Sequence, residues 1–242
     1  MPALHGSRGL VVGGAHRLGK AIALDLARAG ADVAISYHTS AHAAEGTRAE
    51  IEALGVRTAA FAAEAGDPAQ MAALVDSAAV ELGGLEIVVY CPSAGFLPVR
   101  PQDVTEELFD VAFDSTAKGF MFAAQAAHRQ MAASGGGVIV AITDVAGVQA
   151  WPLFTPHGGA KAAQIQMVKS LALAWGKDGV RVCGVAPGPV LLPDGVRGDK
   201  EETALGRIGE PADVCRTVRF LIESDFITGS NVVVDGGRIL RP

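Results

Sequence analysis

Short apolar runs alternate along the chain with longer, alanine-rich stretches in which apolar residues recur at helical spacing. The runs predict buried strands at 9–12, 32–36, 57–61, 86–90, 137–142, 180–186 and 231–234. The stretches predict helices at 18–29, 41–54, 68–82, 104–112, 115–133, 158–175 and 211–223. Such alternation is typical of βαβ units that build a parallel sheet. We therefore predict a single α/β domain over residues 1–242, a Rossmann-type, doubly wound parallel sheet of about seven strands with helices on both faces.

Composition excludes several classes of protein. Half of the 242 residues are hydrophobic, which is enough to bury one sizeable core and excludes disorder as the main state. A net charge of -6 lacks the basic excess that phosphate backbones require, so we expect no nucleic acid partner. No uncharged apolar run approaches the roughly 18 residues of a membrane helix, and the first residues lack the apolar core of a signal peptide. We expect a soluble, cytoplasmic protein with no membrane partner.

The cysteines and histidines do not predict a metal site. Cys91, Cys183 and Cys215 are odd in number and show no CxxC spacing, which argues against a disulfide framework and a zinc site. We expect reduced, mostly buried thiols. His38 and His42 are spaced to share a helix face, but no third ligand lies near them in the sequence.

A glycine-rich turn, Gly13-Gly14-Ala15-His16-Arg17-Leu18-Gly19, follows the first predicted strand directly and opens the first predicted helix. Small residues allow the backbone to approach a pyrophosphate, and the start of the helix offers free N–H groups and a positive dipole end. A plain tight turn is the alternative interpretation. The position between the first strand and the first helix favours a dinucleotide site.

The loop after the second predicted strand bears on the choice between NAD and NADP. NAD sites usually place an acid there to hold the ribose 2′-hydroxyl, whereas Tyr37, His38, Thr39 and Ser40 include none. These side chains and the nearby Arg17 are suited to surround a 2′-phosphate. The prediction is NADP(H); the alternative is that Arg17 is only a solvated surface residue.

These motifs together resemble the short-chain dehydrogenase/reductase family, and most closely its pteridine reductase branch, over nearly the whole chain. The family's glycine motif falls on Val12 to Gly19, and Arg17 in place of the middle glycine is typical of that branch. Tyr37-His38-x-Ser40 is similar to the branch's 2′-phosphate loop. Other matching segments are Pro187-Gly188-Pro189-Val190, Arg207-x-Gly209-x-Pro211, Ile227-Thr228-Gly229 and Val234-Asp235-Gly236-Gly237. The resemblance implies cofactor contacts from Gly13, His16, Arg17, Leu18, Gly19, Tyr37, His38, Thr39, Ser40, Glu64, Ala65, Cys91, Pro92, Ser93, Lys161, Pro187, Gly188 and Val190.

The resemblance also implies a catalytic set, with changes. The family uses a Tyr-x-x-x-Lys pair on one helix and a Ser 13 residues before the Tyr. Lys161 matches the Lys, His157 stands at the Tyr position, and Asp144 stands at the Ser position, as in pteridine reductases. The family's upstream Asn falls on Thr116, and its Asn-Asn-Ala-Gly motif falls on Tyr90-Cys91-Pro92-Ser93.

An imidazole at position 157 is able to donate the proton that accompanies hydride transfer, because it titrates ordinarily near pH 6.5 and a nearby Asp144 favours its charged form. Lys161 lies one helical turn further on the same face, and its positive charge, with that of an oxidised nicotinamide, opposes the charged imidazole, so the sequence does not give the net direction of the shift. Asp144, His157 and Lys161 are therefore the predicted catalytic residues of a reductase acting on a carbonyl, imine or pterin-like substrate. The alternative is a catalytically impaired protein that keeps the fold and binds the dinucleotide in a regulatory or binding role.

Three aromatic residues are candidates to line the substrate pocket. Phe96 falls within one residue of the position where pteridine reductases stack their flat substrate, and Trp151 and Phe154 precede His157. The alternative is that all three anchor loops to the core. Residues 191–202 have the composition of a lid. The resemblance implies a homotetramer, or a homodimer, of the chain.

Overall fold

The computed structural model describes residues 4–191 and 202–240. In these residues seven parallel strands form one sheet in the order β3-β2-β1-β4-β5-β6-β7. The strands are β1 (Arg8–Val12), β2 (Asp32–Tyr37), β3 (Thr58–Ala62), β4 (Ile87–Tyr90), β5 (Gly137–Ile142), β6 (Val180–Pro187) and β7 (Asn231–Val234). The predicted Rossmann-type sheet is confirmed. Its strand order reverses between β1 and β4, which places the ends of these strands at a switch point.

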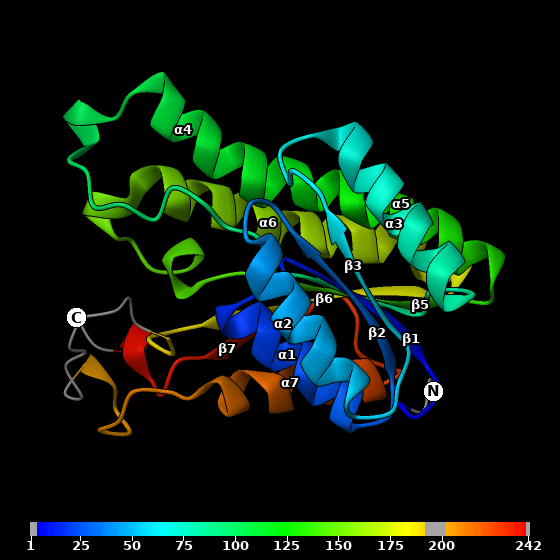
Figure 1. The fold of residues 1–242 in the computed structure, drawn as a ribbon. Helices are drawn as coiled ribbons and strands as arrows, with labels where there is room; N and C mark the ends of the chain where they lie inside the picture. Colours follow the sequence, from blue (N-terminus) through cyan, green and yellow to red (C-terminus); the bar gives the residue numbers. More distant parts are fainter. Residues whose placement is uncertain (1–3, 192–201, 241–242) are drawn as a thin grey trace.

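Helices cover both faces of the sheet (Figure 1). One layer contains α1 (Arg17–Arg28), α2 (Ala41–Glu52) and α7 (Pro211–Glu223). The other contains α3 (Pro68–Leu82), α4 (Glu106–Phe113), α5 (Gly119–Ala133) and α6 (Thr155–Trp175). Successive strand residues point to opposite faces, so Val11 packs into the core under the first layer and Leu10 and Val12 into the core under the second.

The helices predicted at 104–112 and 115–133 are present as α4 and α5, but no loop separates them. The chain is helical from Glu106 to Ala133 and passes through a π-helical turn at Asp114–Lys118. No Gly or Pro stands at 113–114 to stop the helix, and the Ser115 hydroxyl donates to the Val111 carbonyl at 2.8 Å within the turn. At Gly119 a Cβ would overlap the Ala65 carbonyl and the Tyr90 hydroxyl, so only glycine permits this close packing.

Other boundaries differ by a few residues. Helix α6 begins at Thr155, three residues before the predicted start, because Pro156 fits the first turn of a helix. Cys183 and Cys215 are buried as predicted, whereas Cys91 is half-buried. Within the described residues, every helix is too short or too polar to cross a lipid bilayer.

Candidate active site

A cleft of about 420 Å³ opens at the carboxyl ends of β1, β2, β3 and β4, beside the reversal of strand order. This is where open α/β sheets bind ligands. The predicted cofactor contacts that line it are Gly13, His16, Arg17, Leu18, Gly19, Tyr37, His38, Glu64, Ala65, Cys91, Pro92 and Ser93. Segments far apart in the sequence thus meet in one cavity. The lining also includes Ser36, Ala94 and Ser115, which the sequence analysis missed.

The glycine-rich turn is shaped for close approach of a ligand. Gly13 adopts a φ of +74°, which favours glycine, and its N–H donates to the Ser36 hydroxyl at 3.0 Å. A Cβ at Gly19 would overlap the Gly13 carbonyl. In the part of the chain that the structure describes, the N-cap residue His16 makes no side-chain hydrogen bond to the α1 amides. The first N–H groups of α1 therefore remain available to an anion.

Arg17 connects this turn to the segment after β6. Its guanidinium Nη2 donates to the Leu191 carbonyl at 2.5 Å, rather than to the loop after β2 that the sequence analysis associated with it. Among the described residues it is the single non-glycine residue with positive φ, at 51°. A left-handed conformation costs a residue with a Cβ about 1–2 kcal/mol, so the fold holds Arg17 in a strained backbone.

This strain gives a testable prediction. Arg17→Gly is expected to be more stable than Arg17→Ala, with a free energy of unfolding about 1 kcal/mol higher. Both variants lose the guanidinium, but only glycine adopts a positive φ without strain. Urea unfolding of the two variants measures the difference. The same pair at Lys20, inside α1, is the control and should reverse the order, since glycine destabilises a helix interior. Equal stability of the two Arg17 variants would contradict a strained backbone.

At the far end of the cleft His38 and Glu64 form an ion pair, with Nε2 and Oε2 2.8 Å apart. Glu64 Oε1 also accepts from the Gly66 N–H at 3.0 Å. Both residues were predicted cofactor contacts, but their pairing was not predicted, because they follow different strands. The loop after β2 is free of acids, yet β3 brings a carboxylate beside it. Thr39 is exposed and Ser40 is the N-cap of α2, and neither lines the cleft.

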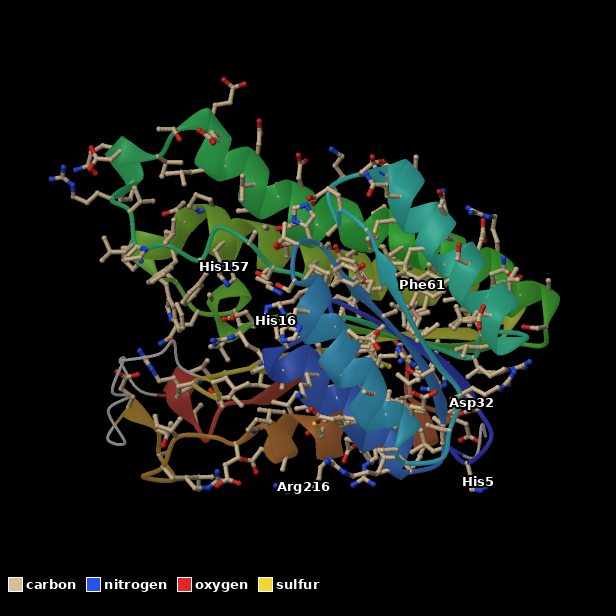
Figure 2. The ribbon with its side chains drawn as sticks, viewed as in Figure 1. His5, His16, Asp32, Phe61, His157 and Arg216 are labelled. Carbon is tan, nitrogen blue, oxygen red and sulfur yellow. The ribbon has the colours of Figure 1, made fainter. Side chains whose placement is uncertain are left out.

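The three predicted catalytic residues come together after β5 and on α6. Asp144 caps a 3₁₀ turn (Val145–Gly147), where its Oδ1 accepts from the Ala146 N–H at 2.7 Å. Its Oδ2 lies 3.4 Å from Nε2 of His157, which is only 3% exposed. The other ring nitrogen, Nδ1, lies 3.4 Å from the Ser93 hydroxyl. His157 and His16 lie at the same end of the sheet, opposite His5 and Asp32 (Figure 2).

Lys161 is buried beside the end of β5, at 2% exposure. Its Nζ donates to the Ile142 carbonyl at 2.7 Å and to Gln164 Oε1 at 3.4 Å. Burial lowers the pKa of Lys161 to about 8, although Asp144 opposes the shift. The side chain therefore remains largely a cation at neutral pH and loses its proton near pH 8. Burial raises the pKa of the neighbouring Cys91 thiol to about 12, which keeps that thiol neutral.

The three predicted substrate residues cluster together, and one of them, Phe96, contacts His157. The Phe96 ring stacks on Phe154 at 4.5 Å between centroids and lies 6.5 Å from Trp151. It also meets the His157 ring edge-on at 4.9 Å. The rings anchor two loops to each other, but Phe96 is still 44% exposed. None of the three rings lines the 420 Å³ cleft itself.

The remaining predicted contacts lie elsewhere. Pro187 ends β6, and the Gly188 N–H donates to the Val234 carbonyl at 3.0 Å. Val190 is buried and lines a separate hollow of about 520 Å³ beside β7. The predicted lid at 191–202 falls mostly outside the described residues. No group of His, Cys, Asp or Glu side chains in the described ranges is able to hold a metal ion.

Two positions on the π-helical turn add to the site. Ser115 accepts from the Ala94 N–H at 3.0 Å and so fixes the loop that carries Ser93. Thr116 is fully buried, and within the described residues its hydroxyl makes no hydrogen bond. The sequence signal for Ser115 was weak, because its importance depends on contact with a loop 21 residues earlier.

Known proteins match this chain over nearly its whole length. Residues 13–238 match the family model described as enoyl-(acyl carrier protein) reductase. The chain is 35% identical over 253 residues to L-rhamnose 1-dehydrogenase (NAD(P)(+)) of Sphingomonas sp., and the matched region covers 98% of each chain. It is 35% identical over 243 residues to 4-formylbenzenesulfonate dehydrogenase of Comamonas testosteroni, which covers 95% of this chain and 96% of that protein.

A solved structure is similarly close. The crystal structure of a short chain dehydrogenase from Burkholderia cenocepacia in complex with NADP matches with a TM-score of 0.91 and 34% identity, over 98% of this chain and 99% of that chain. The fold and the site define an oxidoreductase of the Rossmann type. The chain belongs to the short-chain dehydrogenase/reductase family, whose dehydrogenases use a nicotinamide dinucleotide.

Proposed function

We propose that the protein is an NADP(H)-dependent reductase of a carbonyl, imine or pterin-like substrate, related to the pteridine reductase branch, with His157 as the acid at the position of the family's tyrosine. The observation that carries the proposal is the buried His157 imidazole. It lies 3.4 Å from the Asp144 carboxylate, one helical turn before Lys161 and edge-on to the ring of Phe96.

The residues around the cleft fit a dinucleotide. The turn at Gly13–Gly19 leaves space that a Cβ at Gly19 would fill, and the open amides of α1 suit a pyrophosphate. Tyr37 and His38 would lie at the adenosine ribose. When bound, the nicotinamide supplies the hydride. The protein then has to orient the substrate, exclude water and deliver one proton.

His157 supplies that proton in this proposal. The Asp144 carboxylate faces Nε2 of this acid at 3.4 Å, although Nε2 makes no hydrogen bond within the described residues. The Lys161 ammonium, anchored on the Ile142 carbonyl, provides positive charge beside the nicotinamide ribose. The exposed face of Phe96 suits a flat substrate, and the relative from Comamonas testosteroni is named for 4-formylbenzenesulfonate, an aromatic aldehyde.

The test combines a binding titration with a turnover screen. Quenching of protein fluorescence is followed during titration with NADPH and with NADH. Oxidation of the reduced cofactor is then measured in the presence of dihydropterin, quinones, aromatic aldehydes and small ketones. NADPH binding with turnover of any of these supports the proposal. Tight NADPH binding without turnover supports instead a catalytically impaired protein with a regulatory or binding role.

The ion pair of His38 and Glu64 predicts cofactor preference with a matched pair of variants. His38→Gln is expected to weaken NADPH relative to NADH about fivefold, because it removes an imidazole that would donate a hydrogen bond to the 2′-phosphate. Glu64→Gln is expected to strengthen NADPH relative to NADH by a similar factor, because it removes a repelling carboxylate. The dissociation constants of both cofactors with each variant give the ratio. If both ratios stay at the wild-type value, these residues do not face a 2′-phosphate.

We also propose a homotetramer, or a homodimer, built on the open edge of the sheet. β7 is the last strand of the sheet and only half-buried along its length, and Phe226, Leu173 and Leu240 are exposed. An apolar edge of this kind is costly to leave in water. Light scattering on a size-exclusion column measures the mass, and a monomer at micromolar concentration would contradict the proposal.

A further inference from the structure

The proposed acid has little direct access to a ligand. His157 is only 3% exposed, and its ring is enclosed by Asp144 at 3.4 Å, by Ser93 at 3.4 Å and by the edge-on ring of Phe96. Lys161, the other charged group on its helix, is buried and bound to the Ile142 carbonyl. Some other group must connect the imidazole to a substrate in the cleft.

Ser93 is the member of this cluster that reaches the cleft. It follows β4, is exposed, and lines the cavity between Pro92 and Ala94. Its hydroxyl lies 3.4 Å from His157 Nδ1, on the opposite side of the ring from Asp144. The loop that carries Ser93 is held against the π-helical turn, since the N–H of Ala94 donates to Ser115 Oγ at 3.0 Å. The three side chains form a line from Asp144 through His157 to the Ser93 hydroxyl.

We propose that Ser93 is the catalytic residue that protonates the substrate, as the last member of an Asp144–His157–Ser93 relay; this inference rests on the proposed reductase function. The hydroxyl is exposed and small, and it lies beside the imidazole at the edge of the cleft. Asp144 is less well placed than Ser93 to reach a substrate, because it does not line the cleft and its Oδ1 already accepts from the Ala146 N–H.

The proton transfers balance as follows. As the carbon of a bound carbonyl takes up the hydride, its oxygen takes the Ser93 Oγ proton, so an O–H bond forms on the product and the Oγ–H bond of Ser93 breaks. Ser93 Oγ regains a proton from Nδ1–H of the His157 imidazolium. The neutral imidazole keeps its proton on Nε2, the nitrogen that lies 3.4 Å from Asp144 Oδ2, and water later restores the lost proton. The substrate gains two electrons and two hydrogens in total.

Ser93→Ala and Ser93→Thr test the relay. At an NADPH concentration that saturates each protein, Ser93→Ala is expected to lower kcat at least 100-fold, whatever its effect on NADPH affinity, since Ser93 also lines the cofactor cleft. Ser93→Thr keeps a hydroxyl and is expected to recover most of kcat. Because Ser93 is an exposed loop residue, the Ala variant should fold, and circular dichroism checks this.

A second readout needs no cofactor and no turnover. In the ¹⁵N spectrum of the apoprotein, the Nδ1 resonance of His157, assigned by its loss in His157→Gln, is expected to move in Ser93→Ala and to return in Ser93→Thr. An unmoved resonance overturns the contact. A kcat that is unchanged in Ser93→Ala at saturating NADPH overturns the relay.

These outcomes separate the relay from the function on which it rests. If wild type turns over and His157→Gln removes turnover while Ser93→Ala does not, the relay is wrong and the reductase proposal stands. If wild type binds NADPH and reduces none of the screened substrates, the proposed function and the relay are both overturned, whatever the resonance shows.

Discussion

Replacement of His157 by alanine is expected to lower turnover by roughly 10²- to 10⁴-fold while the NADPH dissociation constant changes less than about threefold. The imidazole is the proposed proton source, since it lies between the Asp144 carboxylate and the Ser93 hydroxyl, whereas the cleft that would hold the dinucleotide is lined by other residues. Steady-state rates at saturating NADPH, with a separate fluorescence titration, measure the two quantities.

His157→Tyr is the more informative variant at this position. It restores the acid of the family at the same place on α6. A gain of ketone or pterin reduction from an inactive parent would mean that the natural protein kept its cofactor site and lost catalysis. Unchanged turnover in His157→Ala would remove the role assigned to His157 and leave Asp144 or water as the source of the proton.

The sheet was predictable from sequence because each of its elements is determined locally. Buried runs such as Leu10–Val12 and Ile87–Tyr90 are continuously apolar. In the helices between them, apolar residues recur at the helical period of 3.6 residues. The join between α4 and α5 was not predictable in this way. It depends on a π-helical turn whose close packing against the Ala65 carbonyl requires glycine at 119, and that contact crosses more than 50 residues.

The site shows the same division between local and distant determinants. The turn at Gly13–Gly19 was predictable because strand, turn and helix follow one another directly. The pairing of His38 with Glu64 and the contact of Ser93 with His157 were not, because each joins residues from different βα units. Arg17 was identified as important, yet the direction of its guanidinium toward Leu191 depends on where β6 ends.

Lys161→Met is expected to reduce both NADPH affinity and turnover by about tenfold or more, because the buried ammonium is the cation beside the proposed nicotinamide site. The proton that Lys161 loses near pH 8 also gives wild type a pH dependence: NADPH affinity is expected to fall above pH 8 in wild type and not in the variant. Loss of turnover alone, with unchanged affinity at every pH, would contradict a ribose-binding role.

The same substitution predicts a change in stability with pH that needs no cofactor. The folded-state pKa of Lys161 is about 8, below its ordinary value of 10.5. Between these values the unfolded chain binds a proton that the folded chain does not, so the free energy of unfolding of wild type should rise with pH over this window. Between pH 7 and pH 10 the free energy of unfolding of wild type should therefore rise by about 2 kcal/mol relative to that of Lys161→Met. Loss of the hydrogen bond to the Ile142 carbonyl adds a pH-independent difference between the two proteins.

Urea unfolding of wild type and Lys161→Met at several pH values measures the difference in stability. Lys169→Met, at an exposed position on α6, is the control for the loss of a lysine as such. A difference that stays constant from pH 7 to pH 10 would mean that the ammonium is not buried as the structure has it.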